Sequence, residues 1–466
     1  MSHFSGALQL TDLDDFITPS QECIKPVQIE KTQTTTGAKI SIGEDGSYNQ
    51  MDVSGSFQKL EKVEITLADC LACSGCITSA EGVLITQQSQ DELLRVFQEN
   101  KKCDKNEAKL IIVSISIQPI LSLAVRYNLA PNECAARLAG YFKHLGADIV
   151  VDMSLAEGFA VLENQKEFLN RFKNAPKTLP MLASSCPGFV CYAEKTHGNF
   201  ILPYISTVKS PQQIMGSLLK STLSKKWDGK LVYHVTVMPC YDKKLEASRS
   251  EFFDADSQTR DVDCVITSIE LEQMLTREGI TLLDMPKSTY SQPWLDGNEE
   301  IEIQLTRNLG SGSGGYSDNI LKRAAKELIG LECDEIVYKN LRNPDFKEIL
   351  LQNNQGEVAL RFAIANGFRN IQNVVQKLKR GKCHYHYIEV MACPSGCLNG
   401  GAQARSQDGT HSKDLIVALE LMYEKLPVLN LYEINEFAKV IISKEEMMRT
   451  EYKAVEKINT ALNIKW

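Results

Sequence analysis

A run of three cysteines places the strongest constraint on what this chain can fold around. In the segment Cys70-Leu-Ala-Cys73-Ser-Gly-Cys76, two residues separate each cysteine from the next. This spacing lets one loop present three thiolates to one face of an iron-sulfur cubane, with small residues between them. Zinc is the rival metal, but zinc sites more often use two separated pairs of Cys or His. The run therefore predicts a [4Fe-4S] cluster in the N-terminal part of the chain.

A fourth thiolate must come from outside this run. The two candidates are Cys23, in the sequence Cys-Ile-Lys-Pro, and Cys103, in a lysine-rich stretch. We favour Cys23, because the polar arm around it can fold back and the following proline stiffens its approach. The predicted ligands of the first cluster are therefore Cys23, Cys70, Cys73 and Cys76.

Three further cysteines each come shortly after an apolar run of strand length. Cys186 follows Leu-Pro-Met-Leu-Ala, Cys240 follows Leu-Val-Tyr-His-Val-Thr-Val, and Cys393 follows His-Tyr-Ile-Glu-Val. The simpler interpretation is that the neighbouring Pro and Gly residues merely end the strands. However, open α/β sheets bind ligands where their strands end, and Cys397 adds a fourth thiol nearby. The pattern therefore predicts a second [4Fe-4S] cluster held by Cys186, Cys240, Cys393 and Cys397.

Composition narrows the compartment and the partners. The chain has 466 residues, 14 cysteines and a formal net charge of −8. No concentrated basic patch stands out, so no nucleic acid partner is expected. Neither a secretory signal nor an apolar run of membrane-spanning length is visible, so we expect no membrane partner, a cytoplasmic location and reduced thiols. Four isolated cysteines are expected to be packing residues: Cys103, Cys134, Cys264 and Cys333.

Strand-length apolar runs alternate with helical segments along most of the chain. They occupy residues 110–117, 149–153, 179–184, 231–238 and 262–266. This alternation is typical of parallel sheets with crossover helices, so the expected fold class is α/β with two lobes. The expected divisions are an irregular arm contributing Cys23, a small cysteine-rich segment, two α/β lobes and a helical tail, at 1–60, 61–105, 106–295, 296–430 and 431–466.

A family resemblance rests on four segments: Ser-Ser-Cys186-Pro-Gly, Ser210-Pro-Gln-Gln213, Met238-Pro-Cys240-Tyr-Asp-Lys243-Lys-Leu-Glu246 and Met391-Ala-Cys393-Pro-Ser-Gly-Cys397. They resemble the signatures of iron-only hydrogenases, and the resemblance covers about residues 60–430. With Cys23, the Cys70 run and the terminal Trp466, the chain is more narrowly similar to eukaryotic hydrogenase-like cytosolic iron-sulfur assembly factors, the nuclear prelamin A recognition factor-like family.

The resemblance carries expectations about fold, cofactors and partners. It implies two hydrogenase-like lobes with mainly parallel sheets, a small ferredoxin-like N-terminal segment and two [4Fe-4S] clusters. It also implies a component of cytosolic iron-sulfur protein assembly that supports maturation of extramitochondrial iron-sulfur proteins. The expected partners are the cytosolic targeting complex and apoprotein clients, with Trp466 resembling a docking tail, although Lys465 departs from the acidic or small residue common there.

Departures from true hydrogenases bear on activity. Ser185 stands where hydrogenases place a relay cysteine, and a serine hydroxyl is a poor proton relay near neutral pH. Lys243 and Glu246 nevertheless keep the hydrogenase spacing after Cys240. We therefore expect no hydrogenase activity and assign no catalytic residue. The alternatives are an iron-only hydrogenase-type oxidoreductase and a two-lobe scaffold that binds zinc.

Two other motifs suggest binding functions that we do not favour. The segment Gly310-Ser-Gly-Ser-Gly-Gly315 satisfies a dinucleotide-binding pattern, but no convincing strand leads into it. The family resemblance implies instead a turn that opens a helix near the cluster, with backbone N–H groups toward sulfur. The segment Cys383-His-Tyr-His386 runs into a strand, where alternation places the thiol opposite both imidazoles, so core or surface histidines are expected.

Overall fold

A computed structural model describes residues 39–42, 48–51, 57–59, 85, 87–104, 107–223, 226–227, 230–255, 258–294, 299–333, 335–341, 343–405, 412–441 and 445–454. The chain divides into two compact units. The smaller unit covers Gln21–Gly82, and the larger one covers Met1–Ser20 and Val83–Trp466. The candidate site built from described residues belongs to the larger unit.

The smaller unit contains a three-stranded antiparallel sheet. Its strands are β1 (Lys39–Ile42), β2 (Tyr48–Met51) and β3 (Phe57–Lys59), paired in that order. The sequence pattern predicted an irregular arm over 1–60, and the structure differs there. The strands are only three or four residues long, which is too short for hydrophobic alternation to reveal them.

A four-stranded parallel sheet forms one half of the larger unit. Its order is β10 (Cys264–Thr267), β7 (Val232–Met238), β4 (Leu110–Ile115) and β5 (Ile149–Asp152). Every residue of the central strand β4 is buried. Because helices cover both faces of a parallel sheet, its strands read as continuous apolar runs. This arrangement explains why the sequence pattern located the strands.

Four helices pack around this sheet, namely α3 (Gln90–Lys102), α4 (Ile117–Tyr127), α5 (Pro131–Leu145) and α11 (Ser268–Arg277). Ser89 caps α3, because its side chain accepts a hydrogen bond from the Glu92 N–H. Thr267 and Glu270 form a capping box at the start of α11. α5 ends at Gly146, whose φ of 112° is a backbone conformation that favours glycine.

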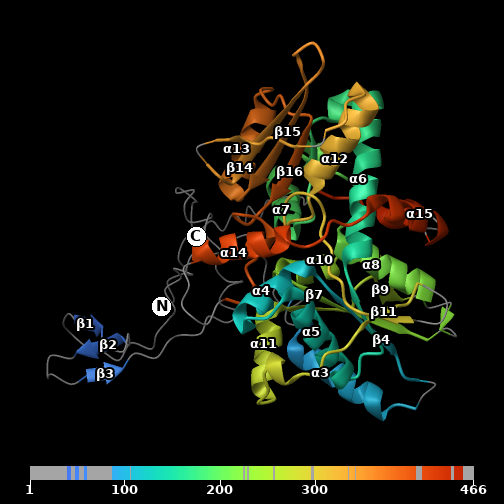
Figure 1. Cartoon of the computed structure of the whole chain (residues 1–466), viewed down its shortest axis with the longest axis vertical. Helices are drawn as coiled ribbons and strands as arrows, with labels where there is room; N and C mark the ends of the chain where they lie inside the picture. The colour runs from blue at the N-terminus through green and yellow to red at the C-terminus, as the bar shows by residue number, and fades with distance from the viewer. Residues whose placement is uncertain are drawn as a thin grey trace, which may run out of the picture. The chain divides into compact units, whose positions relative to one another are not determined.

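A mixed five-stranded sheet forms the other half, with the order β13-β14-β15-β16-β6. The pairs β15–β16 and β16–β6 are parallel, whereas β13–β14 and β14–β15 are antiparallel. Figure 1 shows this sheet and the four-stranded sheet in different halves of the unit. Its strands are β13 (Lys339–Asn340), β14 (Phe346–Gln352), β15 (Val358–Asn366), β16 (Tyr387–Met391) and β6 (Met181–Ala183).

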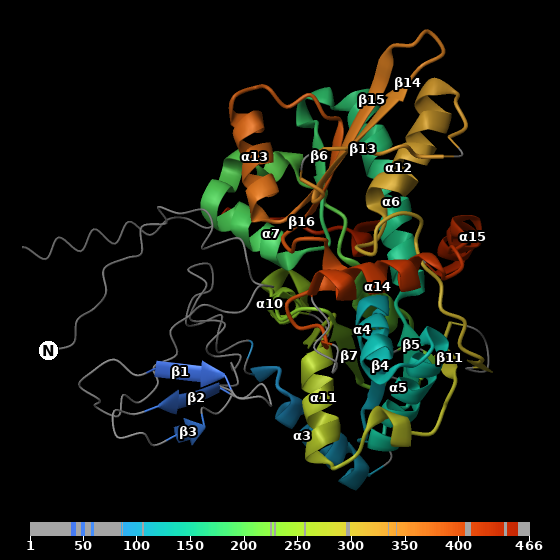
Figure 2. The same cartoon turned by 60° about the vertical axis from the view of Figure 1, so that its left-hand side comes forward.

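The long helix α6 (Ser154–Asn174) contacts β6, α8 and α12. It runs beside the five-stranded sheet and reaches toward the other half of the unit (Figure 2). The remaining α-helices are α7 (Pro187–Tyr192), α8 (Pro211–Leu218), α10 (Asp242–Ala247), α12 (Tyr316–Ala324), α13 (Phe368–Lys379), α14 (Ser412–Glu424) and α15 (Leu431–Ile441). Two short hairpins complete the larger unit: β8 (Phe253–Asp254) with β9 (Thr259–Arg260), and β11 (Tyr290–Gln292) with β12 (Glu299–Ile301).

The predicted α/β class with mainly parallel sheets is confirmed, but the halves differ from the expected lobes. The sequence pattern placed residues 179–184 in the lobe over 106–295, whereas β6 pairs with β16 in the five-stranded sheet. A three-residue strand carries no signal that tells which sheet it joins. The predicted helical tail over 431–466 is helical in α15 and in a short turn at Glu445–Met448, and residues 449–454 are not helical.

No helix in the part of the chain that the structure describes combines the length and the apolar character needed to cross a membrane.

Candidate metal centre

Four of the predicted ligands can be located and four cannot. Cys186, Cys240, Cys393 and Cys397 all belong to the larger unit. The other four, and the terminal Trp466, lie outside the described residues: Cys23, Cys70, Cys73 and Cys76. The site below is therefore built from the first four cysteines alone.

Three strand ends from two different sheets supply the cysteines. Cys186 comes three residues after β6 and directly precedes α7. Cys240 follows β7 of the four-stranded sheet, and Cys393 follows β16 of the five-stranded sheet. Cys397 begins the short helical turn Cys397–Asn399 in the same loop as Cys393. The site therefore lies where parallel strands stop, which is the edge at which α/β sheets bind ligands.

Electrostatic coupling shows that the four thiols lie near one another. Cys186 and Cys393 interact with each other, and each also interacts with Cys240 and Cys397. Burial raises the pKa of all four thiols, to about 12 for Cys397. None of them forms a disulfide. Cys186 is buried and the other three cysteines are half-buried. Thiols with raised pKa values need positive charge nearby, such as bound metal, to exist as thiolates.

Two of the sulfur atoms receive hydrogen bonds, one from a backbone N–H and one from a side chain. The Ala392 N–H donates to Cys186 Sγ at 3.5 Å, so the loop after β16 contacts the cysteine that follows β6. Cys397 lies against Ser313, because its backbone N–H donates to Ser313 Oγ at 2.9 Å. The Ser313 side chain also hydrogen-bonds the Cys397 thiol and lowers its pKa against the effect of burial.

The Gly-rich segment 310–315 forms the turn that supplies Ser313. Glu389 of β16 stabilises this turn, because its carboxylate accepts hydrogen bonds from Ser311 Oγ at 2.7 Å and from the Ser317 N–H at 2.8 Å. The turn opens helix α12, as the family resemblance implied. A side chain at Gly315, where φ is 61°, would place Cβ 1.8 Å from Leu309 O.

A buried ion pair adjoins the cysteines. Lys243 Nζ donates to Glu246 Oε2 at 2.9 Å and to the Ser185 carbonyl at 2.8 Å. Burial alone would lower the pKa of the Lys243 ammonium, but the Glu246 carboxylate raises it overall. Its charge lowers the pKa of the Cys397 thiol. Lys243 is therefore a buried cation beside the thiols.

Glu246 is held on its other side as well. Its carboxylate accepts from Ser210 Oγ at 2.9 Å and from Gln212 Nε2 at 3.0 Å. Both donors come from the Ser-Pro-Gln-Gln segment that the sequence analysis singled out. A network of this kind keeps a buried charge satisfied, so Lys243 and Glu246 are held in place.

Ser185 lies at the same centre. The Tyr316 phenol, which is buried and opens α12, hydrogen-bonds it. Asp242, two residues after Cys240, is the neighbour that the sequence analysis did not assign. Its carboxyl faces the backbone of Gly188, where an added Cβ would lie 2.7 Å from Asp242 Oδ2. The position of Asp242 in the motif was visible, but its burial against α7 was not.

Four cysteine thiols are the donor set of a [4Fe-4S] cubane. Among the described residues, no group of three His, Cys, Asp or Glu side chains is arranged to hold one metal ion. A mononuclear zinc site needs such a group within about 2.3 Å of one centre, whereas a cubane is ligated by one thiolate at each iron.

The isolated cysteines behave in two ways. Cys134 and Cys264 are fully buried among apolar side chains, as expected of packing residues. Cys103 is exposed at the end of α3 and Cys333 is half-buried, so these two are not core residues.

His386 of the Cys383-His-Tyr-His386 segment directly precedes β16. Its ring accepts a hydrogen bond from the backbone N–H of Arg361 in β15.

Comparison with known proteins places this geometry in a family. The model of the iron only hydrogenase large subunit, C-terminal domain, matches residues 109–401, which include all four described cysteines of the site. Proteins of Culex quinquefasciatus and Aedes aegypti, each named a probable cytosolic Fe-S cluster assembly factor, are 58% and 57% identical over the full length of both chains. The chain belongs to this hydrogenase-like family of cytosolic Fe-S cluster assembly factors. The alignments with these mosquito proteins cover the whole of both chains, so the N-terminal cysteine run belongs to the region of similarity.

Solved structures similar to this family member are hydrogenases. An [FeFe]-hydrogenase is 26% identical with a TM-score of 0.67, and the match covers 78% of this chain and 98% of that one. The apo [FeFe]-hydrogenase of Chlamydomonas reinhardtii is also 26% identical, with a TM-score of 0.66 and the same coverage. The hydrogenase-like α/β fold that the resemblance implied is confirmed.

Proposed function

We propose that this protein carries a [4Fe-4S] cluster on Cys186, Cys240, Cys393 and Cys397. The observation that carries the proposal is the convergence of four cysteines, one buried and three half-buried, from the loops that follow three strands. Lys243 supplies positive charge beside them, and Ser313 and the Ala392 N–H supply hydrogen bonds to sulfur. Such a cluster, when bound, provides one-electron redox chemistry whose potential depends on these neighbours.

A second [4Fe-4S] cluster is proposed on Cys23, Cys70, Cys73 and Cys76. The support is the two-residue spacing of the Cys70 run, together with full-length similarity to proteins named as Fe-S cluster assembly factors. The protein is proposed to use its clusters in cytosolic iron-sulfur assembly, supporting maturation of extramitochondrial iron-sulfur proteins. Contact with the cytosolic targeting complex and apoprotein clients is proposed to use the terminal Trp466.

Hydrogenase activity is not part of the proposal. Ser185 has a hydroxyl in the place of a relay thiol, and its environment supplies a phenol from Tyr316 and a cation from Lys243. The relatives are named as assembly factors, whereas the hydrogenases are distant at 26% identity. A role in carrying and transferring clusters therefore has better support than hydrogen chemistry.

The test is metal and spectroscopic analysis of the full chain purified without oxygen. The proposal expects about eight iron and eight acid-labile sulfide per chain, with cubane signals in electron paramagnetic resonance. It also expects no carbonyl or cyanide bands in the infrared. Extra iron with those bands would identify a hydrogenase-type oxidoreductase instead, and zinc without iron would contradict both cluster assignments.

Two variants separate the two proposed clusters. Cys240→Ala removes a ligand from the described site, and Cys73→Ala removes one from the N-terminal run. Each is expected to lose about half of the iron while the other cluster's signal remains, because each cubane needs four thiolates. If either variant keeps its full iron content, the ligand set to which that cysteine is assigned is wrong.

A further inference from the structure

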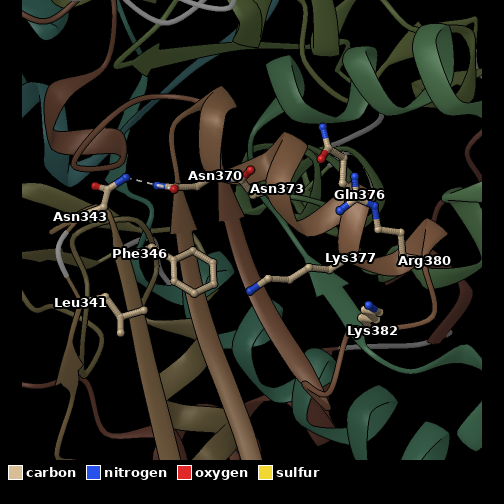
Figure 3. Close-up of a pocket in the computed structure, with 9 residues that line it drawn as sticks. All are labelled: Leu341, Asn343, Phe346, Asn370, Asn373, Gln376, Lys377, Arg380 and Lys382. Atoms are coloured by element: carbon tan, nitrogen blue, oxygen red, sulfur yellow. Dashed lines mark hydrogen bonds between the residues drawn. The ribbon is translucent and has the colours of Figure 1, made fainter.

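A pocket lies on the five-stranded half of the larger unit, and none of the four site cysteines lines it. It has a volume of about 430 Å³ and lies between helix α13 and the chain that leads into β14 (Figure 3). Leu341, Asn343 and Phe346 line one wall. The other wall consists of side chains from α13 and the turn after it. The described site does not use this pocket.

The charge of this pocket is opposite to that of the chain. The formal net charge of the protein is −8, yet Lys377, Arg380 and Lys382 line the pocket and no Asp or Glu does. Residues 358–388 contain six Lys and Arg residues and no acidic residue. The sequence-based expectation of no basic patch followed from the net negative charge of the whole chain, which does not reveal this local basic run. A basic surface on an acidic protein favours an anionic ligand at that surface.

These cations have no carboxylate partner among the described residues. Two carboxylates near the pocket, in and beside β14, already accept hydrogen bonds from other groups. Asp345 accepts from the Ser395 N–H at 2.6 Å, and Glu348 accepts from the Tyr385 hydroxyl at 2.7 Å. Each carboxylate keeps its charge, because both donors are neutral, but neither forms an ion pair with the pocket cations within the described residues.

Lys377 is nevertheless held in place. Its ammonium lies 5.5 Å from the ring centroids of both Phe346 and Tyr385. Figure 3 shows its side chain extending across the pocket toward Phe346, while Arg380 and Lys382 lie near the end of α13. One cation is thus pre-positioned over aromatic rings, and two exposed ones lie farther along the chain.

Side-chain amides form a row on the same helix. Asn373, Gln376 and Arg380 are separated by three and four residues, so they share one face of α13. Asn373 and Gln376 are exposed, and neither side-chain amide makes a hydrogen bond within the described residues. An amide both donates and accepts, as a peptide group does. These two amides can therefore pair with the N–H and C=O groups of an extended peptide backbone.

Apolar surface adjoins the charged and polar groups. Leu341 is 38% exposed at the pocket wall, and Phe346 contributes an aromatic ring. Val337, four residues before Leu341, is 73% exposed. A bare phosphate would need donors alone, whereas this pocket offers cations, amides and an apolar wall together.

We propose that the pocket between α13 and β14 binds an extended acidic segment of a partner protein that carries a large apolar side chain. Carboxylates of the segment meet Lys377, Arg380 and Lys382, its backbone meets Asn373 and Gln376, and its apolar side chain packs on Leu341. None of the four site cysteines lines this surface, so it offers the protein another contact for partners.

Fluorescence anisotropy with the full chain, purified without oxygen, tests the proposal. The probe is a fluorescein-labelled ten-residue peptide that alternates aspartate with leucine. The double variant Arg380→Glu/Lys382→Glu is expected to bind it at least about tenfold more weakly, because charge-assisted contacts are lost and repulsion is added. Leu341→Ser is expected to weaken binding about threefold through the lost apolar contact.

The matched control is Lys101→Glu/Lys102→Glu. These two exposed lysines also end a helix, α3, and their exchange changes the net charge by the same amount. Binding within about twofold of the parent protein is expected there, because long-range charge effects are screened by salt. An equal loss in this control would show a general charge effect and overturn the proposal.

Two further probes separate the alternatives. A peptide with asparagine in place of each aspartate should bind at least about tenfold more weakly than the acidic one. Equal binding of the two peptides, or unchanged acidic-peptide binding in Arg380→Glu/Lys382→Glu, overturns the proposal. Displacement of the acidic peptide by inorganic phosphate or a single-stranded oligonucleotide at lower concentrations than by unlabelled peptide would assign the pocket to phosphate or nucleic acid instead.

Discussion

At Ser185, one side chain shows how a hydrogenase-like centre can serve another purpose. Its carbonyl accepts a hydrogen bond from Lys243, and its side chain interacts with the Tyr316 phenol. These contacts do not depend on a thiol. Serine at this position makes both contacts and carries a hydroxyl, which is far less acidic than a thiol.

The source of the fourth thiolate for the N-terminal cluster leads to a residue-scale prediction. Cys23→Ala is expected to lower the iron content from about eight to about four per chain, because a cubane lacking one thiolate ligand is labile. Cys103→Ala is the matched control, since Cys103 is exposed at the end of α3 and is the rejected candidate. Iron and sulfide assays on both proteins decide the matter. Iron loss in Cys103→Ala with full retention in Cys23→Ala would reverse the assignment.

A buried histidine gives a prediction about pH. His234 is fully buried, and its ring bonds Ser114 Oγ and the Asp261 carbonyl, each at 2.9 Å. Burial lowers its pKa from 6.5 to about 3, and the nearby Lys220 ammonium adds to this. Between about pH 3 and pH 6.5, therefore, His234 binds a proton in the unfolded chain but not in the folded one. The free energy of unfolding is expected to fall by up to about 1.4 kcal/mol per pH unit as pH drops below 6.5.

Urea unfolding at several pH values measures this slope. His234→Gln is expected to be less stable at neutral pH, because it cannot reproduce both hydrogen bonds, but to show a shallower decline toward acid. His144→Gln provides the comparison, as His144 is exposed on α5. A slope in His234→Gln equal to that of the parent protein would contradict the assignment of this pH dependence to His234.

At the scale of elements, the Gly-rich turn depends on one buried carboxyl group. Glu389 has no exposed surface, and its pKa is raised to about 7 by burial. Glu389→Gln leaves one acceptor oxygen for two donors, Ser311 Oγ and the Ser317 N–H. We expect a loss of about 1–3 kcal/mol in the free energy of unfolding, the cost of one unsatisfied buried group. Denaturant unfolding near neutral pH measures it.

The same variant should also release iron faster, since the turn carries Ser313, which bonds Cys397. Following iron release to a chelator separates this effect from stability alone. Glu348→Gln on the neighbouring strand β14 is the control, because its carboxylate accepts from a single hydroxyl and is partly exposed. Iron release as slow in Glu389→Gln as in the control would show that the turn does not support the site.

The elements that the sequence predicted are those with long buried runs. β4 is buried over all six residues and β7 over six of seven, and Cys240 could be placed at the end of such a strand. That the other cysteines follow strands of a different sheet was not visible in the sequence. Two features were out of reach. β6 spans three residues and joins the other sheet, and β1 to β3 alternate too briefly. Side-chain partners such as Glu389 with the Gly-rich turn are separated by 72 residues or more, so no local pattern predicts them.

At the scale of the whole molecule, the chain after α15 ties distant segments together. Arg449 forms ion pairs with Glu163 and Glu167 of α6, at 2.9 and 2.8 Å. The Thr450 N–H donates to the Thr207 carbonyl. The segment that precedes the terminal residues is thus fixed to the five-stranded half. This attachment gives the proposed Trp466 tail a defined starting point on the molecule.

Lys244 connects the chain just beyond the smaller unit to the metal centre. Its side chain is completely buried, and its ammonium donates at 2.6 Å to both the Gln88 carbonyl and Glu270. Gln88 follows the end of the smaller unit by six residues, and Lys244 lies in α10, four residues after Cys240. The Lys244 ammonium therefore links Gln88, near the point where the larger unit resumes at Val83, with α10, the helix that follows the proposed ligand Cys240.

Lys244→Met is expected to lower the free energy of unfolding by about 3–5 kcal/mol, because it leaves the Glu270 carboxylate buried without its partner. Denaturant unfolding measures this loss. Lys244→Met/Glu270→Gln is the paired variant: the amide keeps an acceptor for Thr267 and removes the uncompensated charge, so much of the loss should be recovered. The single variant should also be cleaved faster by protease near residues 87–89, because Gln88 loses its ammonium donor. If the single variant lost less than about 1 kcal/mol, the pair would behave as an exposed ion pair does, and the proposed link between the chain's entry and the metal centre would fail.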